Sequence, residues 1–185
     1  MPSPLGHALG GIAAAWVAVP RRNWNAALIL AATALAPDLD LLVGDHRGIS
    51  HSLGAAVVAG LIGWTAAALR QRRQPRLRPL GHATRIGSWS DASALRWGVA
   101  IGLAWASHIA FDWLSNDTRP PIGVMALWPI TRDYYKAAIE IFPPVSRRWG
   151  DVRFWQHNIY AAAMEVLIMT PLLLLAVRWF RRQSR

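Results

Sequence analysis

The chain contains no cysteine, and only 16% of its 185 residues are charged. Without cysteine there can be no disulfide and no thiolate metal site, so any bound metal must be held by nitrogen and oxygen ligands. Acidic residues are scarce, with ten Asp and Glu against twenty Lys and Arg. Hydrophobic residues make up 54% of the chain, which is more apolar than a typical soluble domain. The length fits a single domain covering residues 1–185.

Apolar segments separated by basic turns predict an all-α polytopic membrane bundle of about five spans. The segments that approach the length of the bilayer core are residues 5–19, 24–43, 53–69, 95–114 and 159–180. A long loop with short helices is expected between the last two spans, where it is a candidate lid over a site. No Lys or Arg precedes the first segment, so we do not expect a signal peptide there, and His7 should remain in the mature protein.

The net charge of +10 raises the question of nucleic-acid binding. The basic residues lie mainly at the ends of apolar segments, which is typical of membrane proteins, so no nucleic-acid partner is expected. By the positive-inside rule the turn at 21–23, the loop at 70–96 and the tail from 178 are cytoplasmic. This threading predicts an N-terminus outside the cytoplasm and a C-terminus inside it.

Metal-capable side chains gather at the ends of the predicted spans. Because successive spans alternate in direction, all of them should meet on one side of the membrane, the non-cytoplasmic side in this threading. Carboxylates and imidazoles are costly near a bilayer, so such a cluster predicts a functional site. Its members are His7, Asp38, Asp40, His46, His51, His108 and Asp112.

Two short elements would aim carboxylates at a common point. His108 and Asp112 are four residues apart, so on a helix they share a face and can bind one ion together. Asp38 and Asp40 follow Pro37, and in an extended stretch two residues with this spacing point the same way. An ordinary capping or core role is the alternative for each pair.

The segment from 46 to 52 brings two imidazoles close together. Gly48 permits a tight turn between His46 and His51, and Ser50 is expected to cap the helix of the third span. Arg47 is predicted to pair with a carboxylate or with an anionic group of a substrate.

Three carboxylates and four imidazoles are enough for one zinc ion or for a two-metal site. Manganese and iron use the same ligand types and stay open as alternatives. A bound metal can lower the pKa of a coordinated water to about 7, and a carboxylate that does not ligate the metal can act as general base.

These motifs together resemble the YdjM-like family of bacterial inner-membrane, metal-dependent hydrolases. The resemblance rests on Pro-Asp-Leu-Asp at 37–40, His-Arg-Gly-Ile-Ser-His-Ser at 46–52, the pair His108 and Asp112, the early His7 and the segment 123–135. It covers residues 1–135 and implies a multi-span helical protein of the bacterial inner membrane with a divalent-metal site. The chain departs from the family in Ser50, where threonine is usual, and at 115–118, where relatives have a glycine-containing turn.

The order of the ligands is also similar, more loosely, to that of zinc-dependent phospholipases C and single-strand nucleases. That likeness implies five direct metal ligands and leaves other residues to transfer protons and to stabilise charge in the reaction. Asp38 and His46 become candidates for the general base or for outer contacts, and Arg47 would stabilise an anionic transition state. The implied metal ligands are His7, Asp40, His51, His108 and Asp112.

The sequence therefore predicts a membrane-bound, metal-dependent hydrolase of an ester or phosphodiester, such as a lipid, that acts through a metal-activated water. A metal transporter or metal-binding membrane protein is one alternative, although its ligands should lie near the bilayer midplane. A non-catalytic scaffold locked by polar contacts is another. Glu165 and Asp117 have no assigned role, and His82 is expected to be solvated in its basic loop.

Overall fold

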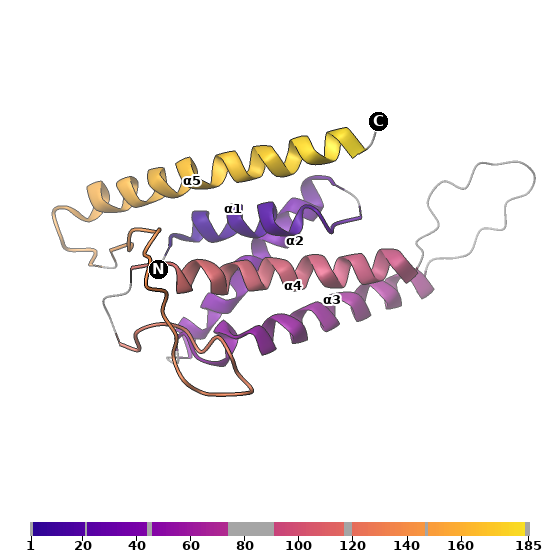
Figure 1. Ribbon diagram of the computed structural model, residues 1–185, viewed down its shortest axis with the longest axis horizontal. Coiled ribbons are helices and arrows are strands. Elements are labelled where there is room, and N and C mark those ends of the chain that lie inside the picture. The colour runs from indigo at the N-terminus through magenta and orange to yellow at the C-terminus, as the bar shows by residue number, and fades with distance from the viewer. Residues whose placement is uncertain are drawn as a thin grey trace, which may run out of the picture.

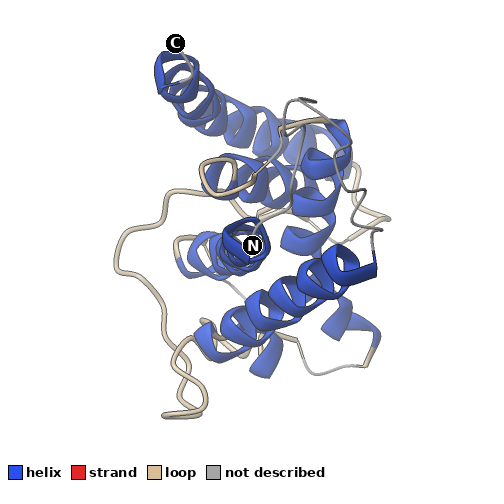
Figure 2. Ribbon diagram, turned by 90° about the vertical axis from the view of Figure 1, so that its right-hand side faces the viewer, coloured by secondary structure: helices blue, strands red, loops and turns tan. Residues whose placement is uncertain are grey.

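The computed structural model describes residues 2–20, 22–43, 46–73, 91–116, 120–146 and 148–183. Within those ranges the regular elements are helices, and Figure 2 shows no strand. The elements are α1 (Pro4–Ala15), α2 (Trp24–Leu35), η1 (Ala36–Leu42), η2 (Ile49–His51), α3 (Leu53–Arg73), α4 (Asp91–Trp113) and α5 (Phe154–Gln183), where η marks a 3-10 helix. The all-helical fold predicted from the sequence is confirmed.

Three stretches of the described chain are helical, long and apolar enough to cross a membrane: Trp24–Leu42, Leu53–Arg73 and Phe154–Arg178. They correspond to the predicted spans 24–43, 53–69 and 159–180. The predicted span 5–19 forms only the 12-residue helix α1, which is about 18 Å long and shorter than the roughly 30 Å apolar core of a bilayer. The total of five spans therefore stays a prediction.

The helix α4 is the centre of the bundle. It packs against α1, α2, α3 and η1, whereas α5 packs against α1 on one side (Figure 1). Because neighbouring helices surround it, α4 can carry polar side chains inward where a lipid-facing helix could not. The core that it shares with α1 and α2 is made of small or branched residues: Ala15, Val19, Ala26, Leu30, Ala100 and Ala104.

Glycines set the close crossing of α3 and α4. A Cβ atom built on Gly98 would lie 2.9 Å from the carbonyl oxygen of Gly60, and one on Gly60 would lie 3.0 Å from that of Gly98. Small residues at such a crossing let two backbones touch, which is how membrane helices associate. This crossing fixes the axis of α4, which carries two of the predicted ligands, against α3.

The loop after α4 differs from its prediction. No helix occurs in its described parts, 120–146 and 148–153, where short helices were expected. Instead its backbone forms isolated bridges, between Val124 and Tyr135 and between Ser115 and Phe142. It also binds the start of α3, because the amides of Leu53 and Gly54 donate to Ala126 and Trp128. Five prolines in the loop deny it the amide donors of a helix, and its backbone pairs with the helix ends instead.

Candidate metal centre

The two aspartates after α2 point to opposite sides of one imidazole. Pro37 ends the α-helical bonding, and the chain tightens into the 3-10 helix η1. With three residues per turn, side chains two positions apart diverge by about 120°. Asp38 Oδ1 lies 3.6 Å from Nε2 of His51, and Asp40 Oδ2 lies 3.0 Å from its Nδ1. The extended conformation and common direction expected for this pair were wrong.

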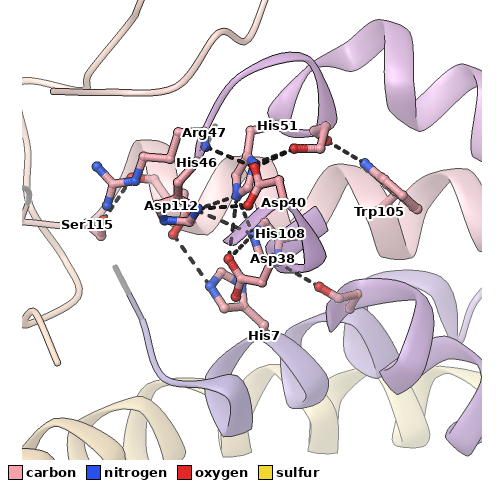
Figure 3. A network of polar contacts seen from close by, with 12 residues as sticks. His7, Asp38, Asp40, His46, Arg47, His51, Trp105, His108, Asp112 and Ser115 are labelled. Carbon is pink, nitrogen blue, oxygen red and sulfur yellow. Dashed lines mark hydrogen bonds and ion pairs between the residues drawn. The ribbon is translucent and has the colours of Figure 1, made fainter. Parts of the chain in front are cut away.

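His51 is buried at the end of η2, and its outer nitrogen is held by polar partners. Nδ1 faces Asp40 and also lies 2.9 Å from the hydroxyl of Ser50, which itself donates to Asp40 at 2.6 Å. The backbone of Ser50 is fixed from α4, because Trp105 Nε1 donates to its carbonyl oxygen at 2.8 Å. These contacts leave Nε2 of His51 facing the interior of the site (Figure 3).

His108 presents the same atom from α4. Its Nδ1 lies 2.7 Å from the carbonyl oxygen of Ala34, which can only accept, so Nδ1 carries a proton and Nε2 is the nitrogen turned toward the site. Nε2 of His108 lies 3.0 Å from Nε2 of His51. Asp112, one turn further along α4, places Oδ2 at 3.4 Å and 3.3 Å from these two nitrogens.

Four side chains thus converge on one point. Asp38, His51, His108 and Asp112 each offer a ligand atom, and these atoms all lie within 4.8 Å of one another. Three buried carboxylate oxygens, Oδ1 of Asp38 and both oxygens of Asp112, have no hydrogen-bond partner among the described residues. Buried acceptors without donors are costly, and two imidazoles and two carboxylates form a donor set that suits a divalent ion. The residues therefore fit a metal.

The outer contacts match those of metal-bound histidines. A histidine that ligates a metal through Nε2 usually donates its Nδ1 proton to a carboxylate or a carbonyl, which fixes the ring. Asp40 stands in this position for His51, and the carbonyl of Ala34 does so for His108. A second group that could hold a metal ion consists of Asp38, Asp40, His46 and His51. It has Asp38 and His51 in common with the first group.

His7 reaches the cluster from α1. Its ring stacks on that of His108, with the centroids 3.8 Å apart and the planes at 17°, and its Nε2 lies 3.5 Å from Oδ1 of Asp112. It is fully buried. Asp112 therefore stands between His7 on one side and the pair His51 and His108 on the other.

His46 and Arg47 flank the cluster. Nδ1 of His46 bonds Asp40 at 2.9 Å, and its Nε2 is buried without a partner in the described chain. Burial lowers the pKa of His46, against the opposing pull of Asp40, so its imidazole is neutral near pH 7. Arg47 adopts a positive φ of 68°, and its amide donates to Asp40 at 3.0 Å. Its guanidinium points toward Ser115 (Figure 3).

The pKa of His51 reflects the carboxylates around it. Burial alone would lower that pKa, but Asp112, Asp38 and Asp40 together raise it to about 10. Without a metal these carboxylates favour the protonated form of His51, in which Nδ1 can donate to Asp40 and Nε2 carries the second proton. The proton on Nε2 occupies the place that the cluster offers to a cation.

Comparison with known proteins agrees with this architecture. The model of the family described as YdjM inner membrane protein matches residues 1–184. The chain belongs to the YdjM inner membrane protein family. No curated protein and no solved structure matches it. The YdjM assignment supports a membrane location, while the metal-capable cluster is a finding of the geometry.

Some residues that build this YdjM site were missed or misplaced in the sequence analysis. The carbonyl of Ala34 and the indole of Trp105 gave no signal, because their roles depend on how the helices pack. Ser50 was expected to cap α3, but Ser52 does so, accepting from the amide of Ala55 at 3.0 Å. His82 and Asp117 lie outside the described residues.

Proposed function

We propose that the protein is a membrane-bound, metal-dependent hydrolase that cleaves an ester or phosphodiester. One observation carries the proposal: the Nε2 atoms of His51 and His108 converge with Asp112 and Asp38, while both Nδ1 atoms face acceptors. A purely structural polar core would be expected to pair its buried acceptors, and here three carboxylate oxygens have no hydrogen-bond partner among the described residues, with imidazole nitrogens no closer than 3.3 Å.

The geometry favours exchanging the roles of the two aspartates. Asp38 becomes a metal ligand together with His51, His108 and Asp112, because its Oδ1 faces their ligand atoms. Asp40 acts as the outer partner that orients His51. His7 completes the set beyond Asp112, as a further ligand or as the first ligand of a second ion. We favour zinc, and manganese and iron use similar ligands.

The remaining polar groups can handle protons and anionic charge. A divalent ion in such a site supplies a Lewis acid that lowers the pKa of a coordinated water to about 7. His46 is neutral near pH 7 and has a free Nε2, so it can accept a proton from the attacking water. Arg47 is assigned to the anionic group of the substrate, and its fixed backbone limits where its guanidinium can reach.

Surface features favour a substrate with an apolar part. Among the cluster residues only Asp38 and His46 have appreciably exposed side chains, at 17% and 18%. Beside them Leu39, Leu42 and Val43 expose 62%, 83% and 80% of their surface. Leu39 and Leu42 belong to the candidate span Trp24–Leu42, so this exposed apolar surface can face lipid directly beside the polar site. We infer that a lipid or a lipid-like phosphoester approaches along η1.

We propose that the site lies at the non-cytoplasmic face of the inner membrane and that α5 ends in the cytoplasm; the basic residues at the other helix ends support this orientation. Fluorescent-protein fusion after α5 should be fluorescent, because this reporter matures in the cytoplasm. Fusion of alkaline phosphatase at the same point should be inactive. The reverse pair of results would invert the orientation.

The deciding experiment measures metal content and hydrolysis together. Detergent-purified protein is analysed for bound zinc, manganese and iron and is then assayed on phosphodiester and lipid ester substrates. We expect at least one ion per chain and metal-dependent turnover, both lost in Asp112→Asn and kept in Asp133→Asn, an exposed aspartate. Bound metal without turnover would favour a metal transporter or metal-binding protein. Protein that stays metal-free after growth with added metal would favour a scaffold.

A further inference from the structure

A buried carboxyl group outside the metal cluster lies on α5, an apolar helix most of which is exposed at the edge of the bundle. Glu165 is 0% exposed, although α5 presents Leu167, Leu172, Leu174 and Leu175 outward. An acidic side chain within an apolar helix is costly, so its presence calls for specific partners. Both of its oxygens have one: Oε1 accepts from the amide of Ser3 at 2.6 Å, and Oε2 accepts from the hydroxyl of Ser3.

Ser3 links Glu165 to the first turn of α1 by hydrogen bonds. Its hydroxyl oxygen caps the helix by accepting from the amide of Gly6 at 3.2 Å, and its carbonyl oxygen accepts from the amide of His7 at 3.1 Å. Gly6 gives the carboxyl group its space, since a Cβ atom there would lie 2.5 Å from Oε2 of Glu165. A continuous chain of hydrogen bonds therefore runs from α5 to the backbone of His7.

His7 depends on that chain, because its ring has no hydrogen-bond partner of its own. Neither ring nitrogen is bonded to any group in the described chain, in contrast to the Nδ1 atoms of His51 and His108. The ring is placed by stacking on His108 and Phe111, by the 3.5 Å approach of its Nε2 to Asp112, and by the position of α1. Whatever fixes the first turn of α1 therefore fixes the distance from Nε2 of His7 to Asp112.

We propose that Glu165 is a positioning residue of the metal centre, which holds His7 against Asp112 through Ser3. This inference rests on the proposed function in so far as the centre binds metal. Its mechanical half, that Glu165 fixes the first turn of α1, is independent of any metal. The two halves can be measured separately on the same full-length protein.

The mechanical half is tested on metal-free protein by hydrogen exchange of the amides of Gly6 and His7. Glu165→Ala should speed their exchange by about fivefold or more, the factor expected for losing a net hydrogen bond. The matched control is Glu140→Ala, which removes the other glutamate of the chain, an exposed one. If Glu165→Ala does not fold, Ser3→Ala removes the hydroxyl contacts and keeps Glu165. Unchanged exchange in the folded variant overturns the proposal.

The link to the site is tested by a double-mutant cycle on the dissociation constant for zinc. Glu165→Ala should weaken binding by about tenfold, the lower end for losing an outer partner of a ligand. In a His7→Leu background the same change should have less than about twofold effect, because its target is gone. Equal weakening in both backgrounds would mean a general loss of stability and would overturn the link. Wild type without zinc would overturn the proposed function and the link, and the exchange result would still stand.

A second pair of variants checks the geometry. Gly6→Ala should weaken zinc binding like Glu165→Ala, because the new methyl group displaces the carboxyl group. Gly150→Ala is its control, since a Cβ atom there meets nothing within 4 Å. Equal zinc binding by Gly6→Ala and wild type would show that the close approach of Glu165 does not set the position of His7.

Discussion

The two sides of the cluster are built differently. On one side, His51 and His108 each have an outer nitrogen tied to an acceptor, Asp40 or the carbonyl of Ala34, and an inner nitrogen aimed at the other. On the other side, His7 has no such tie in the described chain and is placed by its helix. A ring held by an outer partner is oriented before a metal arrives, whereas a ring without one is only as well placed as its backbone.

Asp112 joins the two sides, so the largest effect is expected there. Oδ2 faces His51 and His108 while Oδ1 faces His7. Asp112→Asn keeps the shape but removes the charge and one acceptor, and zinc binding should weaken by more than about 100-fold. Titration of zinc followed by calorimetry checks this. Zinc affinity close to that of wild type would show that the cluster is not a metal centre.

The two aspartates of η1 compare an inner position with an outer one directly. Asp38→Asn removes a proposed ligand and should cost as much as Asp112→Asn. Asp40→Asn removes the partner of Nδ1 of His51 and should cost about 10- to 100-fold. Zinc titration of both variants decides the order. If Asp40→Asn bound zinc clearly more weakly than Asp38→Asn, Asp40 would be the direct ligand, as the sequence analysis predicted.

Protons compete with the metal on the His51 side. The pKa of His51 is raised to about 10 by three carboxylates that outweigh its burial, and a ligating Nε2 must lose that proton. Zinc affinity should therefore rise about tenfold per pH unit from pH 7 to 9 and level off above about 10. The stability of the metal-free protein should change in the opposite direction. Its imidazolium stabilises the fold fully below the unfolded pKa of about 6.5, and this is lost as pH approaches 10. Titration and thermal unfolding at several pH values check both.

Absence of any pH dependence in zinc binding between 7 and 9 would contradict a protonated His51 in the metal-free site. Asp40→Asn provides the control. With one of the three carboxylates neutralised, the pKa of His51 should fall, and the rise of affinity with pH should level off earlier.

The elements that carry the site were predictable, but the orientation of their side chains was not. Alternating helices bring span ends to one side regardless of packing detail, so the gathering of His7, His51, His108 and Asp112 followed from the sequence. The roles of Asp38 as inner ligand and Asp40 as outer partner depend on the conformation of the chain after Pro37. Side chains two residues apart point the same way in an extended chain, but they diverge by about 120° in the 3-10 helix that the structure has.

Contacts between helices were also beyond the sequence. Glu165 had no role assigned from the sequence, because its partner Ser3 lies 162 residues away and only the packing of α5 on α1 pairs them. The serine before Pro4 does carry the signal of a helix cap, which the structure uses for α1. Likewise, the hydropathy of the residues that form α4 does not show that other helices surround it in the structure.

The smallest effect is expected at His7, and it has two opposite parts. His7→Leu replaces a buried imidazole without hydrogen-bond partners by an apolar side chain of similar volume. Removing this buried imidazole, which has no hydrogen-bond partner, should stabilise the metal-free protein by about 1 kcal/mol. The affinity for zinc should fall by about tenfold or less. Thermal unfolding with and without zinc measures both parts. His51→Leu is the contrasting variant, because it strands three carboxylates and should destabilise the protein in either state. If His7→Leu instead lost zinc as completely as Asp112→Asn, His7 would be a full member of the first site and the two sides would be equivalent.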